Sequence, residues 1–142
     1  MSTIINVVKD FPTVRLVLIG NGNEYSHFKK FVRKKNITNV LFTGKLTWDN
    51  VLPYYQYSSV LFAKLEANYC SAIPSKLFEY LSTGLPIIYS GEGAATKLLE
   101  QFDHVQLIQT NDEQGLREAI LKMQNVPVSI SYENRLHIYR KY

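Results

Sequence analysis

The residues best suited to chemistry lie together at a predicted helix start. Pro74 and Ser75 predict that start, because proline is favoured in the first turn of a helix. The backbone N–H groups of Ser75, Lys76 and Leu77 have no partner within such a helix, and with the helix dipole they would form an anion site. Lys76 adds a cation, and Glu79 lies about one turn further along, where its carboxylate can accept two hydroxyl groups. The pattern suits a nucleoside diphosphate; alternatively, Glu79 only complements the dipole and Lys76 is solvated.

A second candidate is a glycine turn, in which Gly20 and Gly22 follow the apolar segment 14–19 and precede a helical pattern. Such a turn can bring the backbone close to a phosphate. The full dinucleotide fingerprint fails, because the third glycine position is Tyr25 and no acidic residue follows at the end of a second strand. We therefore do not expect an NAD site. A ligand-facing loop and a tight turn without a ligand both remain open.

The other reactive side chains give weaker signals. His27, His104 and His137 are far apart in the sequence, without partners at the spacing of a catalytic triad or a metal site. Glu66 follows an apolar segment and could reach a cleft, but acidic residues in such loops are often solvated. Cys70 has no neighbour that would activate its thiol. No metal site is predicted.

Short apolar segments alternate with helical patterns along the whole chain, which indicates an α/β fold with a mainly parallel sheet covered by helices. The predicted strands are residues 14–19, 39–43, 59–63, 86–90 and 105–108. The predicted helices are residues 24–35, 50–57, 75–82, 94–102, 112–124 and 131–142. The strands are continuously apolar, as expected for burial on both faces. A doubly wound domain usually opens with a strand, and the pattern predicts that this chain lacks that opening strand.

The composition fits one intracellular domain. The chain has 142 residues, a single cysteine and a net charge of +4, and no apolar run approaches the roughly 20 residues that span a bilayer. We expect a cytoplasmic protein that has no disulfide and does not bind nucleic acid. Residues 1–45 carry eight Lys and Arg against two Asp and Glu. Many of these cations occupy one face of the predicted helix 24–35, which is either solvated or attracted to anionic lipid or a polyanion.

Several segments together match one known family. They are the strand with Gly20-x-Gly22, the Val40-x-Phe42-x-Gly44 turn, the segment 51–60 with Tyr55 and Ser58, and the PSKxFEYxxxGxP run that starts at Pro74. Over about residues 5–125 the chain resembles the nucleotide-sugar-binding half of glycosyltransferase family 4, which has the GT-B fold. The resemblance implies a three-layer Rossmann-like domain, and the PSKxFEY form is typical of bacterial members that build surface polysaccharides.

The resemblance also implies roles for particular residues. Glu79 matches the second glutamate of the E-x7-E motif, which binds the donor ribose, whereas Ser71 replaces the first glutamate, which contacts the donor sugar. Ser75 and Lys76 match the diphosphate contacts, and Lys76 is a candidate to stabilise the leaving group. The other implied substrate-binding residues are Gly20, Gly22, Gly44, Lys45, Leu46, Pro74 and Leu77. The fold requires no metal or cofactor.

The function expected from this resemblance is donor binding in a retaining glycosyltransferase that uses a nucleoside diphosphate sugar, UDP-linked, for surface polysaccharide synthesis. Residues 1–142 would be one domain and a fragment, inactive alone, because the acceptor-binding half and the first strand with two phosphate-binding cations are absent. The acceptor would be a glycan or lipid-linked sugar at the inner membrane face. The alternatives are an inactive nucleotide-binding or interaction module and half of a sugar-nucleotide 2-epimerase. Self-association through an exposed sheet edge and peripheral membrane contact are also expected.

Overall fold

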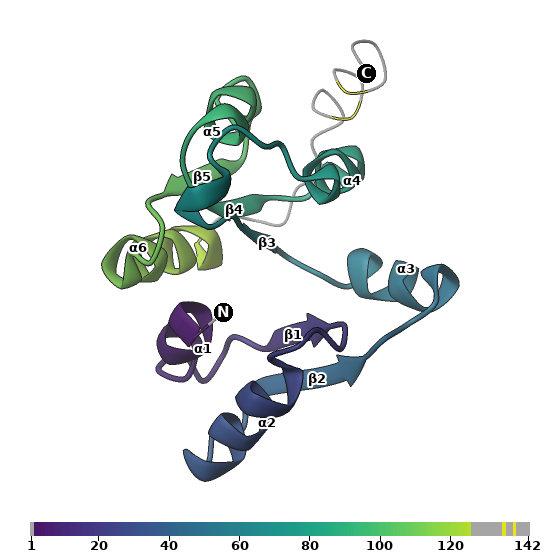
Figure 1. The fold of residues 1–142 in the computed structure, drawn as a ribbon, viewed down its shortest axis with the longest axis vertical. Helices are drawn as coiled ribbons and strands as arrows, with labels where there is room; N and C mark the ends of the chain where they lie inside the picture. The colour runs from purple at the N-terminus through teal and green to yellow at the C-terminus, as the bar shows by residue number, and fades with distance from the viewer. Residues whose placement is uncertain (1, 126–134, 136–137, 139–142) are drawn as a thin grey trace. The chain divides into compact units, whose positions relative to one another are not determined.

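The computed structural model describes residues 2–125, 135 and 138. Helices and strands alternate along the described chain (Figure 1). The elements in order are α1 (Ser2–Val8), β1 (Leu16–Ile19), α2 (Tyr25–Lys34), β2 (Val40–Gly44), α3 (Trp48–Gln56), β3 (Leu61–Lys64), the short 3₁₀ helix η1 (Ala67–Tyr69), α4 (Ser75–Thr83), β4 (Ile87–Ser90), α5 (Ala94–Leu99), β5 (Val105–Ile108) and α6 (Glu113–Gln124). The predicted helix 131–142 lies outside the described residues.

The chain divides into two compact units, residues 1–57 and residues 58–142. In the first unit, β1 and β2 form a parallel pair. The side chain of Asn39, the residue before β2, donates hydrogen bonds to the segment before β1. Its Nδ2 lies 2.8 to 3.0 Å from the carbonyl oxygens of Val8, Phe11 and Val14. One side chain thus connects the end of α1 and the start of β1 to β2.

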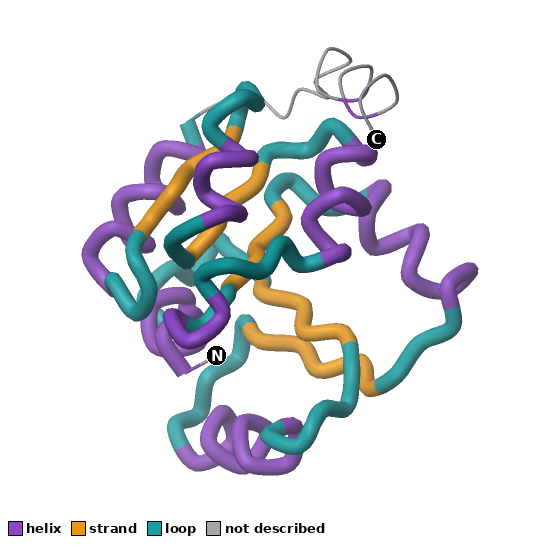
Figure 2. Tube along the Cα trace, turned by 45° about the horizontal axis from the view of Figure 1, so that its top comes forward, coloured by secondary structure: helices purple, strands orange, loops and turns teal. Residues whose placement is uncertain are grey.

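In the second unit, β3, β4 and β5 form a parallel sheet with β4 at its centre. Figure 2 shows these strands in orange with helices beside them. Strand β4 is buried along its whole length, and Tyr89 is 0% exposed. The core around it contains large apolar side chains from α4, α5 and α6. They include Leu77, Leu81, Leu99 and Leu116, each no more than 1% exposed.

Strand pairing is parallel in both units. The described strands pair as β1-β2 in the first unit and as β3-β4-β5 in the second. The parallel α/β class is therefore confirmed, and the strands pair as two sheets rather than one.

Burial differs between the two sheets. The continuous apolar strands predicted burial on both faces, and in the described residues only β4 meets that expectation throughout. Ile19 in β1 is 40% exposed and Leu41 in β2 is 46% exposed. The prediction is wrong for these two strands, because side chains point to the faces of a sheet and the described residues do not fully cover the faces at Ile19 and Leu41.

Candidate functional site

The start of α4 has the geometry that Pro74 and Ser75 predict, with one difference. Pro74 is the extended residue before the helix, with φ −60° and ψ 131°. The N–H of Leu77 donates to the carbonyl of Pro74 at 2.9 Å, so the prediction that this group is free for a ligand is wrong. The first turn closes through an i to i+3 bond, as helix ends often do. The N–H groups of Ser75 and Lys76 have no acceptor within the helix.

Lys76 and Glu79 form an ion pair on α4. The Nζ of Lys76 lies 3.1 Å from both Oε1 and Oε2 of Glu79. The Lys76 side chain is 53% exposed, whereas that of Glu79 is 25% exposed. The lysine can therefore swing into solvent or onto a ligand, while the carboxylate is held by its surroundings. The neighbouring Tyr80 has its pKa raised by burial and, to a smaller extent, by the charge of Glu79.

A backbone hydrogen bond joins the loop before α4 to the start of α5. Ser71 lies exposed in the loop before α4. The N–H of Ala94 donates to the carbonyl of Cys70 at 2.8 Å, which brings the start of α5 next to the residue that precedes Ser71. Because β3 and β4 are parallel neighbours, the loops that follow them lie at the same edge of the sheet.

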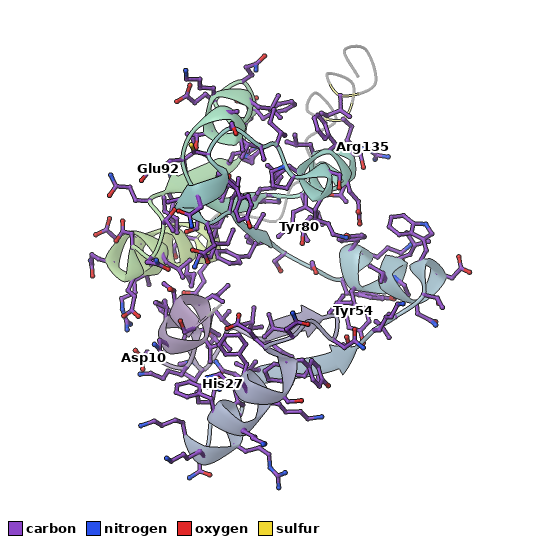
Figure 3. The ribbon with its side chains drawn as sticks, viewed as in Figure 1. Asp10, His27, Tyr54, Tyr80, Glu92 and Arg135 are labelled. Carbon is purple, nitrogen blue, oxygen red and sulfur yellow. The ribbon has the colours of Figure 1, made fainter. Side chains whose placement is uncertain are left out.

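This contact identifies a segment that sequence reasoning did not single out, Gly91-Glu92-Gly93. Gly93 has φ +89°, and a Cβ at this position would clash with the carbonyl of Cys70. Glu92 is exposed between the two glycines, and Figure 3 labels it ahead of α5 in the same unit as Tyr80 on α4. The signal was in the sequence, since a glycine pair follows the strand at 86–90 and precedes a helix. It resembles the turn at Gly20 and Gly22.

The glycines of the first unit lie where β1 and β2 end. The N–H of Gly20 donates to the carbonyl of Gly44 at 2.8 Å, and the two residues form an isolated bridge. Both have positive φ, 130° for Gly20 and 77° for Gly44. Lys45 is exposed and Leu46 half-buried directly after this bridge. The structure thus brings Gly20, Gly44, Lys45 and Leu46 together, with Gly22 in the exposed turn before α2.

The remaining candidates have local structural explanations. His27 is exposed on α2 and its ring meets the ring of Phe28 edge-on, and His104 occupies a turn with φ +60°. The carboxylate of Glu66 lies 2.8 Å from the Nζ of Lys64, whose hydrogen bond and charge lower the pKa of that carboxyl. His137 lies outside the described residues. Within those residues, no group of three or more His, Cys, Asp or Glu is placed to hold a metal ion.

The family follows from the sequence itself. Residues 2–139 match the family model described as glycosyl transferases group 1, so the chain belongs to that family. Comparison with curated protein sequences finds none that matches. The family assignment agrees with the fold.

Solved glycosyltransferase structures share this fold. Sucrose-phosphate synthase from Thermosynechococcus elongatus matches with a TM-score of 0.81 and 19% identity, over 97% of this chain and 37% of its own. The lipopolysaccharide outer core galactosyltransferase WaaB in its apo form matches with a TM-score of 0.74 and 16% identity, over 99% of this chain and 40% of its own. AviGT4, a glycosyltransferase involved in avilamycin A biosynthesis, matches with a TM-score of 0.67 and 19% identity, over 89% of this chain and 37% of its own.

The fold is therefore that of the C-terminal, Rossmann-like half of GT-B glycosyltransferases. The chain spans 37 to 40% of the length of these structures. None of the helices among the described residues has the length and apolar character needed to cross a bilayer.

Proposed function

We propose that the chain is the donor-binding part of a retaining glycosyltransferase of family 4, in the PSKxFEY branch. It takes a nucleoside diphosphate sugar, UDP-linked, and acts in bacterial surface polysaccharide synthesis. The observation that carries the proposal is the start of α4, where Lys76 adjoins two N–H groups without helical acceptors and contacts Glu79. Family membership supports glycosyl transfer as the reaction class.

Each polar group at this helix start has a proposed task. The N–H groups of Ser75 and Lys76 and the ammonium of Lys76 bind the diphosphate, where the positive end of the helix dipole favours an anion. Glu79 lies one turn further along and accepts the ribose hydroxyls. Lys76 also stabilises the negative charge on the departing diphosphate. No cofactor or metal is part of the proposal.

The resemblance supports further proposed roles outside α4. In the first unit, Gly20 and Gly22 are assigned to the lining of the donor cleft, and Gly44, Lys45 and Leu46 to the base. Ser71 stands at the donor-sugar position, and Pro74 and Leu77 shape the helix start. The acceptor is a glycan or lipid-linked sugar that is bound elsewhere in the enzyme, which works at the cytoplasmic face of the membrane.

Calorimetry with UDP tests the donor site. We expect weak binding, and we expect Glu79→Gln to reduce its free energy by about 1.5–3 kcal/mol, the value of a hydrogen bond to a charged group. Glu113→Gln is the matched control, because Glu113 is an exposed acid in the first turn of α6. Absence of UDP binding at millimolar concentration in folded protein would refute the proposed site. Equal affinity in Glu79→Gln would remove Glu79 from the ribose.

A module that binds nucleotide without catalysis is the second candidate, and Ser71 favours it because a hydroxyl replaces the carboxylate that the family uses on the donor sugar. The two candidates differ in what they predict for Ser71→Glu. If the site serves transfer, we expect this variant to change the affinity for a UDP-sugar relative to UDP. If only the nucleotide is bound, the ratio of the two affinities stays unchanged.

A further inference from the structure

Helix α2 carries a dense positive face. Five of the seven residues from 29 to 35 are lysine or arginine, all of them exposed, and they are Lys29, Lys30, Arg33, Lys34 and Lys35. The opposite face of the helix is apolar, with Phe28 and Val32 buried in the first unit. The helix itself contains no acidic residue.

The described residues do not neutralise this face. The ion pairs Lys9–Asp10, Lys64–Glu66 and Lys76–Glu79 include no cation of α2. Lys29 instead lies over the ring of Tyr25, with its Nζ 5.4 Å from the ring centroid. An electron-rich ring attracts this ammonium but leaves its charge in place. The face therefore keeps its positive potential.

A groove lies on the other side of the same helix. It has a volume of about 610 Å³ and is lined by residues of α1, α2 and their flanks. His27, Phe31 and Lys35 line it from the α2 side, and on the α1 side Lys9 is paired with Asp10 at 2.9 Å. Lys35 therefore lies apart from the positive face that Lys29, Lys30, Arg33 and Lys34 form.

We propose that the positive face of α2 docks on an anionic lipid bilayer. Clusters of four to eight lysines and arginines on an amphipathic helix attract anionic headgroups. Lys29, Lys30, Arg33 and Lys34 lie within about 140° of one another around the helix axis. A bilayer presents many phosphates in one plane, so these four side chains can bind at once without a fixed geometry. A single-stranded nucleic acid would need exposed aromatic rings for its bases, whereas Phe28 is buried and Phe31 half-buried.

The apolar residues of α2 determine how this docking works. Phe28 and Val32 are buried in the fold, so α2 cannot insert an apolar face into the acyl region as an interfacial helix does. Attraction then depends on charge alone and must weaken with salt. Raising the ionic strength from about 0.1 M to about 1 M shortens the Debye length from about 10 Å to about 3 Å. We expect binding to be lost over this range.

Vesicle sedimentation tests the proposal on the full chain. We expect binding to vesicles of mixed phosphatidylglycerol and phosphatidylcholine, and none to phosphatidylcholine alone. The Lys30→Gln, Lys34→Gln double variant should bind about 30-fold more weakly, at roughly fivefold per cation. The control is Lys97→Gln with Lys122→Gln, which removes the same net charge from exposed positions on α5 and α6. Glutamine keeps a helix propensity close to that of lysine, and circular dichroism verifies the fold.

Three outcomes would overturn the proposal. The first is no binding to anionic vesicles at low salt. The second is equal weakening in the two double variants, because net charge rather than α2 would then control binding. The third is binding to a single-stranded DNA oligonucleotide that depends on Lys30 and Lys34, with no vesicle binding. UDP affinity is measured in the same preparations, so failure of the membrane surface and failure of the donor site are separate results.

Discussion

Lys76 contacts both carboxylate oxygens of Glu79, so the proposed ribose contact is occupied before a ligand arrives. A diphosphate would draw the ammonium away from Glu79 and leave the carboxylate ready for hydroxyl groups. A nucleoside without phosphates would have to displace the lysine by itself. The two parts of a nucleoside diphosphate therefore help one another to bind, through one side chain.

We accordingly predict opposite responses of two ligands to Lys76→Gln. UDP should bind at least about tenfold more weakly, because a hydrogen bond to a charged group is lost. Uridine should bind equally well or better, because Glu79 is no longer paired. Competition calorimetry measures both affinities, with Lys97→Gln as the control for a change in net charge. Equal losses of affinity for UDP and for uridine would contradict the proposed link between diphosphate binding and ribose binding through Lys76.

Tyr89 contains a buried hydroxyl group that has no hydrogen-bond partner among the described residues. An unsatisfied buried polar group costs about 1–3 kcal/mol, so Tyr89→Phe should raise the free energy of unfolding by about 1 kcal/mol. For a chain of this size the melting temperature then rises by roughly 3 °C. Thermal unfolding of the variant beside the wild type measures the change. A destabilised variant would mean that the hydroxyl is bonded in solution.

The side chain of Tyr89 also makes the stability of the fold depend on pH in the alkaline range. Burial raises the pKa of Tyr89 above its ordinary value of about 10. The unfolded chain then loses the proton of this hydroxyl at a lower pH than the folded chain does. The contribution of Tyr89 to the free energy of unfolding is therefore constant below about pH 10, and it is lost as the pH rises above that value. Tyr89→Phe should therefore reduce the fall in stability above about pH 10. Urea unfolding of the wild type and of Tyr89→Phe at neutral and alkaline pH measures how the free energy of unfolding of each protein changes with pH.

At the scale of elements, the turn before α5 depends on a glycine. Gly93→Ala would place a methyl group against the carbonyl of Cys70 in a left-handed conformation, and we expect a loss of at least about 2 kcal/mol. Gly22→Ala is the matched control, because its added Cβ meets nothing within 4 Å and should change stability by less than about 0.5 kcal/mol. Equal effects in urea unfolding would show that the contact does not hold the loop.

Local signals predicted much of the secondary structure. Strand β5 has the expected bounds because its apolar run is short and ends in polar turns. Gly84 ends α4 in a left-handed conformation, with φ 72°, which is the usual role of a glycine at the end of a helix. Helix α5 ends at Leu99 rather than Phe102 because the chain continues as a hydrogen-bonded turn. Phe102 is still buried, so the spacing of apolar residues in the sequence does not distinguish that turn from a further turn of helix.

The sequence predicts the start of α4 but not the contacts around it. Residue types and spacing place a helix start at Pro74 and Ser75, and the structure has the helix start there. The bond from the Leu77 N–H to Pro74 depends on how tightly one turn closes, and the Lys76 ion pair depends on side-chain rotamers. The bond between Ala94 and Cys70 joins residues that are distant in sequence. A pattern of residue types carries no information on these three features.

At the scale of the molecule, the exposed strands predict association. Strand β1 has the sequence LVLI, with none of the lysines or prolines that protect free edges, and Leu41 in β2 is 46% exposed. We propose that the isolated chain self-associates. Leu41→Lys should reduce this association, whereas Leu121→Lys should not, since Leu121 is 50% exposed on a helix. Sedimentation velocity over a range of concentrations measures the oligomeric state of the wild type and of both variants. A wild-type chain that stays monomeric at every concentration would refute the proposal.

The two separate hydrogen-bonded sheets have a consequence for how the chain opens. A backbone ladder spreads protection across the strands that it joins, and among the described residues no ladder joins β1 and β2 to β3, β4 and β5. Regions of one protein can open independently when their bonding networks are separate. We expect amide hydrogen exchange to resolve two cooperative blocks, with the slowest amides in β4 and faster exchange in β1 and β2. Helix α4 packs on β3, so it belongs to the slow block. If α4 binds the donor as proposed, UDP should slow exchange there first.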